Sequence, residues 1–180
     1  MYDFDKIIPR DNTACVKYDL REAYFKNADV LPMWVADMDF ETPPFIREAV
    51  SQRAQHPIYG YSFRTDDYYQ SIIDWLDMRW KWQVEKDWIL FSPGIVPGIN
   101  FAVQSFTEPG EGVIVQPPVY FPFFEAVKSN GRQLVENQLI NNNGKYEIDY
   151  DGLERAAAQS KMILLSSPHN PVGRCWEREE

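Results

Sequence analysis

Cysteine is scarce in this sequence: Cys15 and Cys175 are the two cysteines among 180 residues. They stand far apart and match no metal-ligand or redox spacing. So few thiols are typical of a protein from a reducing compartment, where disulfides rarely persist. We therefore expect two free thiols without a chemical role, no metal site, and a cytoplasmic protein.

Long hydrophobic runs are absent as well. No apolar segment approaches the ~20 residues that a membrane helix needs, and the amino end, Met-Tyr-Asp-Phe-Asp-Lys, lacks the apolar stretch of a signal peptide. Basic residues are outnumbered, with 18 Lys and Arg against 27 Asp and Glu and a net charge of -9. This excess of negative charge disfavours nucleic acid or an anionic membrane as a partner. A small anionic ligand stays compatible with the sequence, because backbone dipoles at a helix N-terminus can outweigh the net charge.

From residue 88 onward, short apolar strands alternate with helical stretches, and this order predicts an α/β fold with a mainly parallel sheet. Residues 1–41 show little periodicity and are typical of an extended arm or a small peripheral subdomain, whereas residues 42–180 are expected to form the large domain. With 44% hydrophobic residues, the chain can bury a core. One expected helix begins after Thr42 and ends before Pro57, and a second is capped by Thr65, runs to Trp80 and lies on a core. Further helices are expected at 95–106, 120–130 and 153–159. Strands are expected at 88–92, at 112–116, around Leu134 and Ile140, and at 162–165, with a turn at 141–144.

The strand expected at 88–92 runs into the turn Ser-Pro-Gly-Ile-Val-Pro-Gly at 92–98, which opens the helix 95–106. The first N–H groups of a helix have no intrahelical partner, so they can hold an anion above the sheet edge, phosphate above all. Gly94 lets the backbone approach a ligand closely, and Pro97 costs little in a first helical turn. An ordinary strand-to-helix turn explains the same residues equally well.

Two other expected strands end in side chains suited to a ligand. Strand 112–116 runs into a proline-rich aromatic segment in which Tyr120 is best placed to stack on a planar ring, although such clusters more often belong to the core. Strand 162–165 runs into a turn where Asn170 offers donors and an acceptor to a ligand, or caps its own backbone. Because parallel strands end at one edge of the sheet, the three segments together predict a site for a phosphorylated aromatic cofactor.

Five motifs spread over the chain carry a family resemblance: Met-Trp-Val-Ala-Asp-Met-Asp-Phe at 33–40, Tyr-Gly-Tyr-Ser at 59–62, Pro-Gly-Ile-Val-Pro-Gly at 93–98, Gln-Pro-Pro-Val-Tyr at 116–120 and Pro-His-Asn-Pro-Val-Gly-Arg at 168–174. In these motifs the chain resembles the amino-terminal half of a fold-type I pyridoxal-phosphate enzyme of the aminotransferase class I/II superfamily, close to the MalY/PatB group of cystathionine β-lyases. The resemblance implies a three-layer αβα fold. In it, residues 42–180 form an incomplete pyridoxal-phosphate-binding large domain, and residues 1–41 form an arm and part of the small domain.

The resemblance also implies how pyridoxal 5′-phosphate is bound. The backbone of Ile95 and Val96 would hold the phosphate, and Tyr120 would stack on the pyridine ring. Asn170 would bond the phenolic oxygen, and Tyr61 would reach the phosphate of a neighbouring subunit. Complete members of the family resemble homodimers with sites at the interface, so a homodimer is expected.

Ala36 and Asp37 resemble the loop that lines the substrate entrance in this family. Considered without the family, Asp37 and Asp39 form a pair of carboxylates, and acids in loops are usually solvated.

The implied reaction is β-elimination of the thiol portion of cystathionine or a similar cysteine conjugate, which gives pyruvate and ammonia. The family's Schiff-base lysine, usually in a Ser-x-x-Lys context, has no counterpart here, and Lys161 precedes a strand at the wrong end of the sheet. We therefore assign no catalytic residue and expect the chain alone to be inactive, and either to aggregate or to depend on a partner. Two alternatives stay open: an aminotransferase, and a non-catalytic fragment or subunit that pairs with a chain carrying the lysine.

Overall fold

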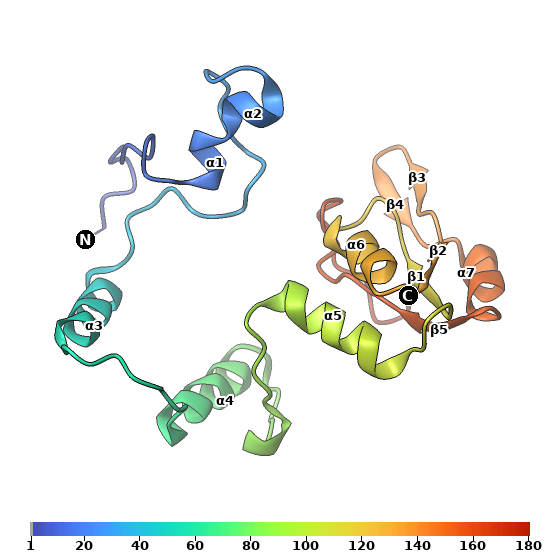
Figure 1. Cartoon of the computed structure of the whole chain (residues 1–180). Coiled ribbons are helices and arrows are strands. Elements are labelled where there is room, and N and C mark those ends of the chain that lie inside the picture. The colour runs from blue at the N-terminus through green and yellow to red at the C-terminus, as the bar shows by residue number, and fades with distance from the viewer. Residues whose placement is uncertain (1) are drawn as a thin grey trace. The chain divides into compact units, whose positions relative to one another are not determined.

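The computed structural model describes residues 2–180, which divide into two compact units on either side of the bond between Asp66 and Asp67 (Figure 1). The functional boundary expected between residues 41 and 42 stays a prediction. None of the helices formed by residues 2–180 is long and apolar enough to cross a membrane.

The N-terminal unit consists of short helices joined by extended segments. Its helices are α1 (Val16–Asp19), α2 (Arg21–Phe25) and α3 (Pro44–Gln55). Helix α3 begins at Pro44, whose missing N–H would have no intrahelical partner in any case, and it ends before Pro57, as predicted. The Trp34 ring lies 4.8 Å from the ring of Tyr24 and 5.5 Å from that of Phe25, so the segment after α2 folds back onto that helix.

The C-terminal unit contains the alternating strands and helices that the sequence predicts. Its elements are α4 (Asp66–Trp80), the 3-10 helix η1 (Lys86–Trp88), α5 (Ile95–Phe106), β1 (Gly112–Val115), α6 (Pro122–Ser129), β2 (Gln133–Glu136), β3 (Ile140–Asn142), β4 (Lys145–Glu147), α7 (Tyr150–Ala157) and β5 (Ser160–Ile163).

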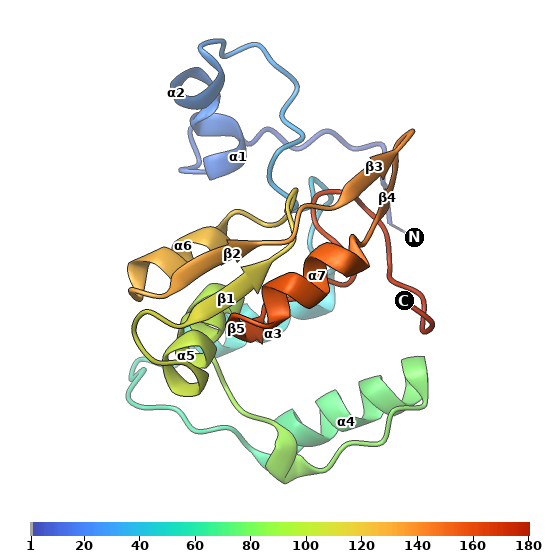
Figure 2. The ribbon, with the colours of Figure 1, turned by 90° about the vertical axis from the view of Figure 1, so that its right-hand side faces the viewer.

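Three strands form a parallel sheet in the order β2-β1-β5 (Figure 2). The central strand β1 is buried along its whole length. Its β-branched side chains suit a strand covered on both faces. Val113 and Val115 pack against α5 and α6, whereas Ile114 packs on the opposite face together with residues of α7. The predicted three-layer αβα arrangement is therefore confirmed, and the alternation along β1 shows which helices cover each face.

The prediction of a strand at 88–92 is wrong. Residues 86–88 form η1, and the backbone that follows is extended at Ile89, with φ -91° and ψ 107°, but is not a strand. An extended segment becomes a strand only where a neighbouring backbone bonds to it. Among the described residues, no strand pairs with this segment.

The single strand expected to include Leu134 and Ile140 is two separate strands. Strand β2 belongs to the parallel sheet, whereas β3 forms an antiparallel hairpin with β4. The predicted turn is correspondingly narrower, at Asn143 and Gly144, whose φ angles are 52° and 91°. An Asn-Gly pair tolerates positive φ and closes a two-residue hairpin, which releases the preceding asparagines for β3.

Helix α7 starts three residues earlier than the predicted 153, because Asp149 caps it. The Asp149 carboxylate accepts a hydrogen bond from the N–H of Gly152 at 3.0 Å. Strand β5 runs from Ser160 to Ile163 instead of from 162 to 165, so Lys161 lies within the strand and not, as predicted, before it. The N–H of Leu164 still donates to the Ile114 carbonyl at 2.9 Å.

Helix α4 forms where predicted, but it buries none of its residues. Its apolar spacing predicts a face that lies on a core, but in the described chain that face is only half covered. Tyr69, Ile72, Ile73 and Leu76 are half-buried, and Trp80 is 62% exposed. Apolar periodicity establishes a helix with an apolar face, whereas the covering of that face depends on what packs there.

Candidate functional site

A groove of about 530 Å³ lies at the carboxyl end of β5, beside the start of α5 and the segment after β1. Its lining side chains are Ile95, Ile99, Tyr120, Phe123, Ile163, Leu164, Leu165, Ser166, Ser167, Pro168 and Asn170. Ligands in open α/β sheets bind outside the carboxyl ends of the strands, which is where this groove lies. The fold thus brings Ile95, Tyr120 and Asn170 together from segments far apart in the sequence.

The N-terminus of α5 supplies free donors at one end of the groove. Gly94 adopts φ 118° and ψ 163°, a conformation open essentially to glycine alone, and its carbonyl accepts a hydrogen bond from the Ser92 hydroxyl at 2.7 Å. The first backbone hydrogen bond of the helix runs from the N–H of Gly98 to the same carbonyl. The N–H groups of Ile95 and Val96 precede it, so they are available to an anion. The side chain of Val96 does not line the groove, and its expected contribution rests on the backbone alone.

Tyr120 is half-buried and lines the groove, while its aromatic neighbours divide between core and surface. Phe123 is buried in the core, with its ring edge-on to Tyr120 at 6.1 Å between centroids. Phe121 is 73% exposed. The core interpretation of the aromatic cluster therefore holds for Phe123, whereas Tyr120 is half-buried and lines the groove.

Asn170 stands at the first corner of a tight turn whose backbone is closed on both sides. The His169 N–H donates to the Arg174 carbonyl at 2.6 Å, and the Gly173 N–H donates to the His169 carbonyl at 2.7 Å. The backbone N–H of Asn170 donates to the Ser166 hydroxyl at 3.2 Å. Within residues 2–180 no hydrogen bond involves the side-chain amide of Asn170, so that group is free for a ligand rather than capping its own turn.

His169, next to Asn170 but outside the lining of the groove, is a buried residue to which sequence reasoning assigned no role. Its side chain is 1% exposed, its Nε2 lies 3.1 Å from the Pro118 carbonyl, and its ring meets Trp176 edge-on at 5.3 Å. Burial lowers the pKa of His169, against the opposing effect of the carbonyl groups of Pro118, Gln116 and Ser166. A histidine in a polar turn carries no sequence signal of burial. The signal that could have identified His169 is its position directly before Asn170.

The other predicted site residues lie in the N-terminal unit, and their expected roles stay predictions. Tyr61 is fully exposed, at 108% of its reference area, and Ala36 and Asp37 lie on an exposed segment. Asp37 is not merely solvated, because its carboxylate forms an ion pair with the guanidinium of Arg10.

Asp37 belongs to a cluster of two carboxylates and two cations. Asp39 accepts from Arg10 at 2.6 Å and from Lys17 at 2.7 Å, and the Lys17 ammonium also donates to the Asp37 carbonyl at 3.0 Å. Lys17 is 6% exposed. Its ammonium and the Arg10 guanidinium lower the pKa of Asp39 to about 2, and the bond to Asp39 raises the pKa of Lys17. The cluster thus ties the segment after residue 36 to the start of the chain and to α1.

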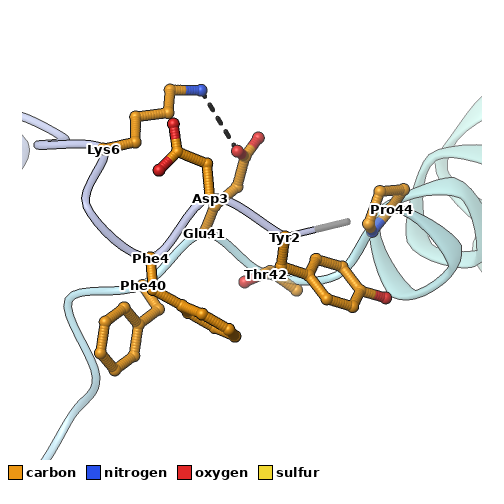
Figure 3. A pocket seen from close by; sticks show the side chains of 8 residues that line it. All are labelled: Tyr2, Asp3, Phe4, Lys6, Phe40, Glu41, Thr42 and Pro44. Carbon is orange, nitrogen blue, oxygen red and sulfur yellow. Dashed lines mark hydrogen bonds and ion pairs between the residues drawn. The ribbon is translucent and has the colours of Figure 1, made fainter.

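A second cavity, of about 340 Å³, lies between the amino end and the segment that precedes α3 (Figure 3). The ammonium of Lys6 lies 3.2 Å from the Glu41 carboxylate, and this cation lowers the pKa of Glu41. The rings of Phe4 and Phe40 meet edge-on at 5.2 Å. These contacts join two exposed segments to each other, and we assign the cavity no ligand.

A parallel sheet with a groove at its carboxyl edge defines a ligand-binding α/β domain. The model of the family "Aminotransferase class I and II" matches residues 28–180, and the chain belongs to that family, as predicted. Cystathionine beta-lyase PatB of Bacillus subtilis is 44% identical over 180 residues, covering 99% of this chain and 46% of that protein.

Solved structures agree with this assignment. Cystalysin from Treponema denticola, whose crystal structure contains a pyridoxal 5′-phosphate cofactor, superposes with a TM-score of 0.92 at 38% identity, covering 100% of this chain and 47% of that one. The PLP-bound C-S lyase from Staphylococcus hominis superposes with a TM-score of 0.88 at 33% identity, covering 100% of this chain and 46% of that one. The chain therefore spans about half the length of the relatives it matches.

Proposed function

We propose that this chain forms the pyridoxal-phosphate seat of a C-S β-lyase, which releases a thiol, pyruvate and ammonia from cystathionine or a related cysteine S-conjugate. The observation that carries the proposal is the meeting of Ile95, Tyr120 and Asn170 on one groove. The names of the relatives support the reaction class, because they include a cystathionine β-lyase and a C-S lyase.

The residues of the groove fit such a cofactor. Its volume of about 530 Å³ suits a small-molecule ligand. The N–H groups of Ile95 and Val96 match a phosphate, and the apolar side chains of β5 and α5 match a pyridine ring. Tyr120 offers a ring face for stacking, and the Asn170 amide offers a donor to the phenolic oxygen.

Pyridoxal phosphate, when bound, supplies an electron sink that acidifies the α-proton of an amino-acid substrate. The residues of the groove bind and orient it, and their apolar walls limit the access of water. The lining contains no lysine, histidine or carboxylate, so these side chains supply no general base. The base for the reaction has to come from outside the groove's described lining.

An aminotransferase is the second candidate, because the matching family model is named for that activity. The same site supports either outcome, since the two reactions diverge after the α-proton is removed. The groove alone does not distinguish them.

The wider assignments belong to the same proposal. We place Ala36 and Asp37 at the substrate entrance and Tyr61 at the phosphate of a neighbouring subunit in a cytoplasmic homodimer. The exposure of Tyr61 leaves its hydroxyl free for such a contact. The substrate class is a sulfur-containing amino acid.

Binding of the cofactor is tested by titrating pyridoxamine 5′-phosphate, which forms no imine with surface lysines, into the purified chain. We expect saturable quenching of tryptophan fluorescence. Tyr120→Ala should weaken binding roughly 2- to 12-fold, corresponding to the ~0.5–1.5 kcal/mol of an aromatic pair, whereas the exposed Tyr2→Ala should not. Absence of saturable binding would contradict the proposed seat.

The reaction is tested in a chimera that joins residues 1–180 to the part of Bacillus subtilis PatB beyond the matched segment. We expect pyruvate and free thiol from cystathionine without a keto-acid acceptor. Turnover only in the presence of a keto acid would instead support the aminotransferase.

A further inference from the structure

His169 joins two of the segments that line the groove at the carboxyl edge of the sheet. One segment follows β1 and carries Tyr120, and the other follows β5 and carries Asn170. The His169 Nε2 lies 3.1 Å from the carbonyl of Pro118, two residues before Tyr120. The backbone of His169 closes the turn of Asn170 through Gly173 and Arg174.

The imidazole makes this link as a neutral ring. A carbonyl accepts, so Nε2 carries the proton, and Nδ1 is buried without a hydrogen-bond partner among the described residues. A second proton would charge a buried ring, and burial, the largest effect on its pKa, disfavours this more than the nearby carbonyls favour it. Arg174, across the turn, is the charged group that acts on the ring, and it also disfavours protonation; the segments around Pro118 and Ser166 bring uncharged carbonyls.

We propose that His169 is a positioning residue for the cofactor: its Nε2–H fastens the turn of Asn170 to the segment of Tyr120, so that the Asn170 amide is held for the phenolic oxygen. The inference rests on the proposed function, which places those two residues on the cofactor. His169 itself does not line the groove and acts through Asn170.

Two substitutions separate the hydrogen bond from the packing of the ring. His169→Phe keeps an aromatic ring against Trp176 but leaves the Pro118 carbonyl without its donor. His169→Gln keeps an amide donor for that carbonyl and does not titrate. His56→Phe, at an exposed histidine of the other unit, is the control.

The readout is affinity for pyridoxamine 5′-phosphate and for its analogue without the phenolic oxygen. We expect His169→Phe to weaken the first about tenfold, as for one lost hydrogen bond, and to weaken the analogue much less. His169→Gln and His56→Phe should stay close to the unsubstituted chain. If His169 had a purely structural role, His169→Phe would weaken both ligands equally. That result, or equal binding by all variants, would overturn this inference but not the proposed function. Failure of the unsubstituted chain to bind would overturn the proposed function as well.

A pH profile gives a second test that does not depend on the phenylalanine variant folding. Affinity of the unsubstituted chain should stay constant through the ordinary imidazole pKa of 6.5 and fall only at lower pH, because burial lowers the pKa of His169 and protonation then charges the buried ring. The ligand phosphate itself titrates at pH ~6, so the comparison is with His169→Gln, whose profile should contain the phosphate's effect alone. Parallel profiles for the two proteins would overturn the role of His169.

Discussion

The buried side chain of Lys17 donates from its ammonium to Oδ2 of Asp39 at 2.7 Å. This pair, with Arg10 and Asp37, holds the segment that bears the predicted substrate-entrance residues. The sequence predicts that the loop carboxylates of Asp37 and Asp39 are solvated, whereas in the structure they form ion pairs.

Titration of Asp39 should reveal this cluster. Because Lys17 and Arg10 lower its pKa to about 2 from an ordinary 3.8, the stabilisation it contributes is complete above pH 3.8 and is lost as the pH falls toward 2. Lys17→Met should raise the pKa of Asp39 and speed amide exchange in the N-terminal unit. Carbon NMR of the carboxyl groups checks the first and hydrogen exchange the second. Lys26→Met, at an exposed lysine, is the control, and an unchanged Asp39 titration would refute the pairing.

Gly94 should be intolerant of a side chain. Its φ of 118° and ψ of 163° cost other residues ~1–3 kcal/mol, so Gly94→Ala should lower the free energy of unfolding by about that amount. It should also weaken phosphate-ester binding, because the strained alanine shifts the first turn of α5. Gly131→Asn is the control, since φ of 70° suits asparagine. Urea unfolding and ligand titration measure both effects, and wild-type behaviour of Gly94→Ala would contradict the assigned turn.

The layer between the sheet and α6 should dominate the stability of the C-terminal unit. Val127 is fully buried there, so Val127→Ala should cost about 1–3 kcal/mol through lost burial and the remaining cavity. Val50→Ala, on the exposed side of α3, should change stability by less than ~0.5 kcal/mol. Equal effects in urea unfolding would mean that α6 does not cover the sheet as described.

A buried amide pair joins the end of β1 to the cap of α7. The Gln116 amide donates to Asn137 at 2.9 Å, and Asn137 donates to the Asp149 carbonyl at 3.0 Å. Asn137→Leu should cost ~1–3 kcal/mol, because Gln116 is left buried without that acceptor. Replacing both Gln116 and Asn137 by leucine should cost less than the sum of the single changes.

The control for this pair is Gln159→Ala, at an exposed amide near the same helix, which should be close to neutral. Strict additivity of the two leucine substitutions in a double-mutant cycle would show that the amides do not act together.

Sequence reasoning succeeded where a local signal and a local cause coincide. Pro44 starts α3, the turn at Gly94 starts α5, and the apolar run of β1 forms the centre of a parallel sheet. It failed where the local structure or its burial depends on a partner that is distant in the chain. The segment 88–92 is extended but has no neighbouring strand among the described residues, and the apolar face of α4 is only half-buried.

The sequence by itself determined the family, the α/β class, and the three segments that carry Ile95, Tyr120 and Asn170, because proline, glycine and apolar periodicity act on their immediate neighbours. Only the tertiary structure decided that these segments share one groove and that His169 is buried between two of them. It alone also showed that Asp39 is paired with Lys17. Each of these depends on residues that are distant in the chain and meet only when the backbone folds.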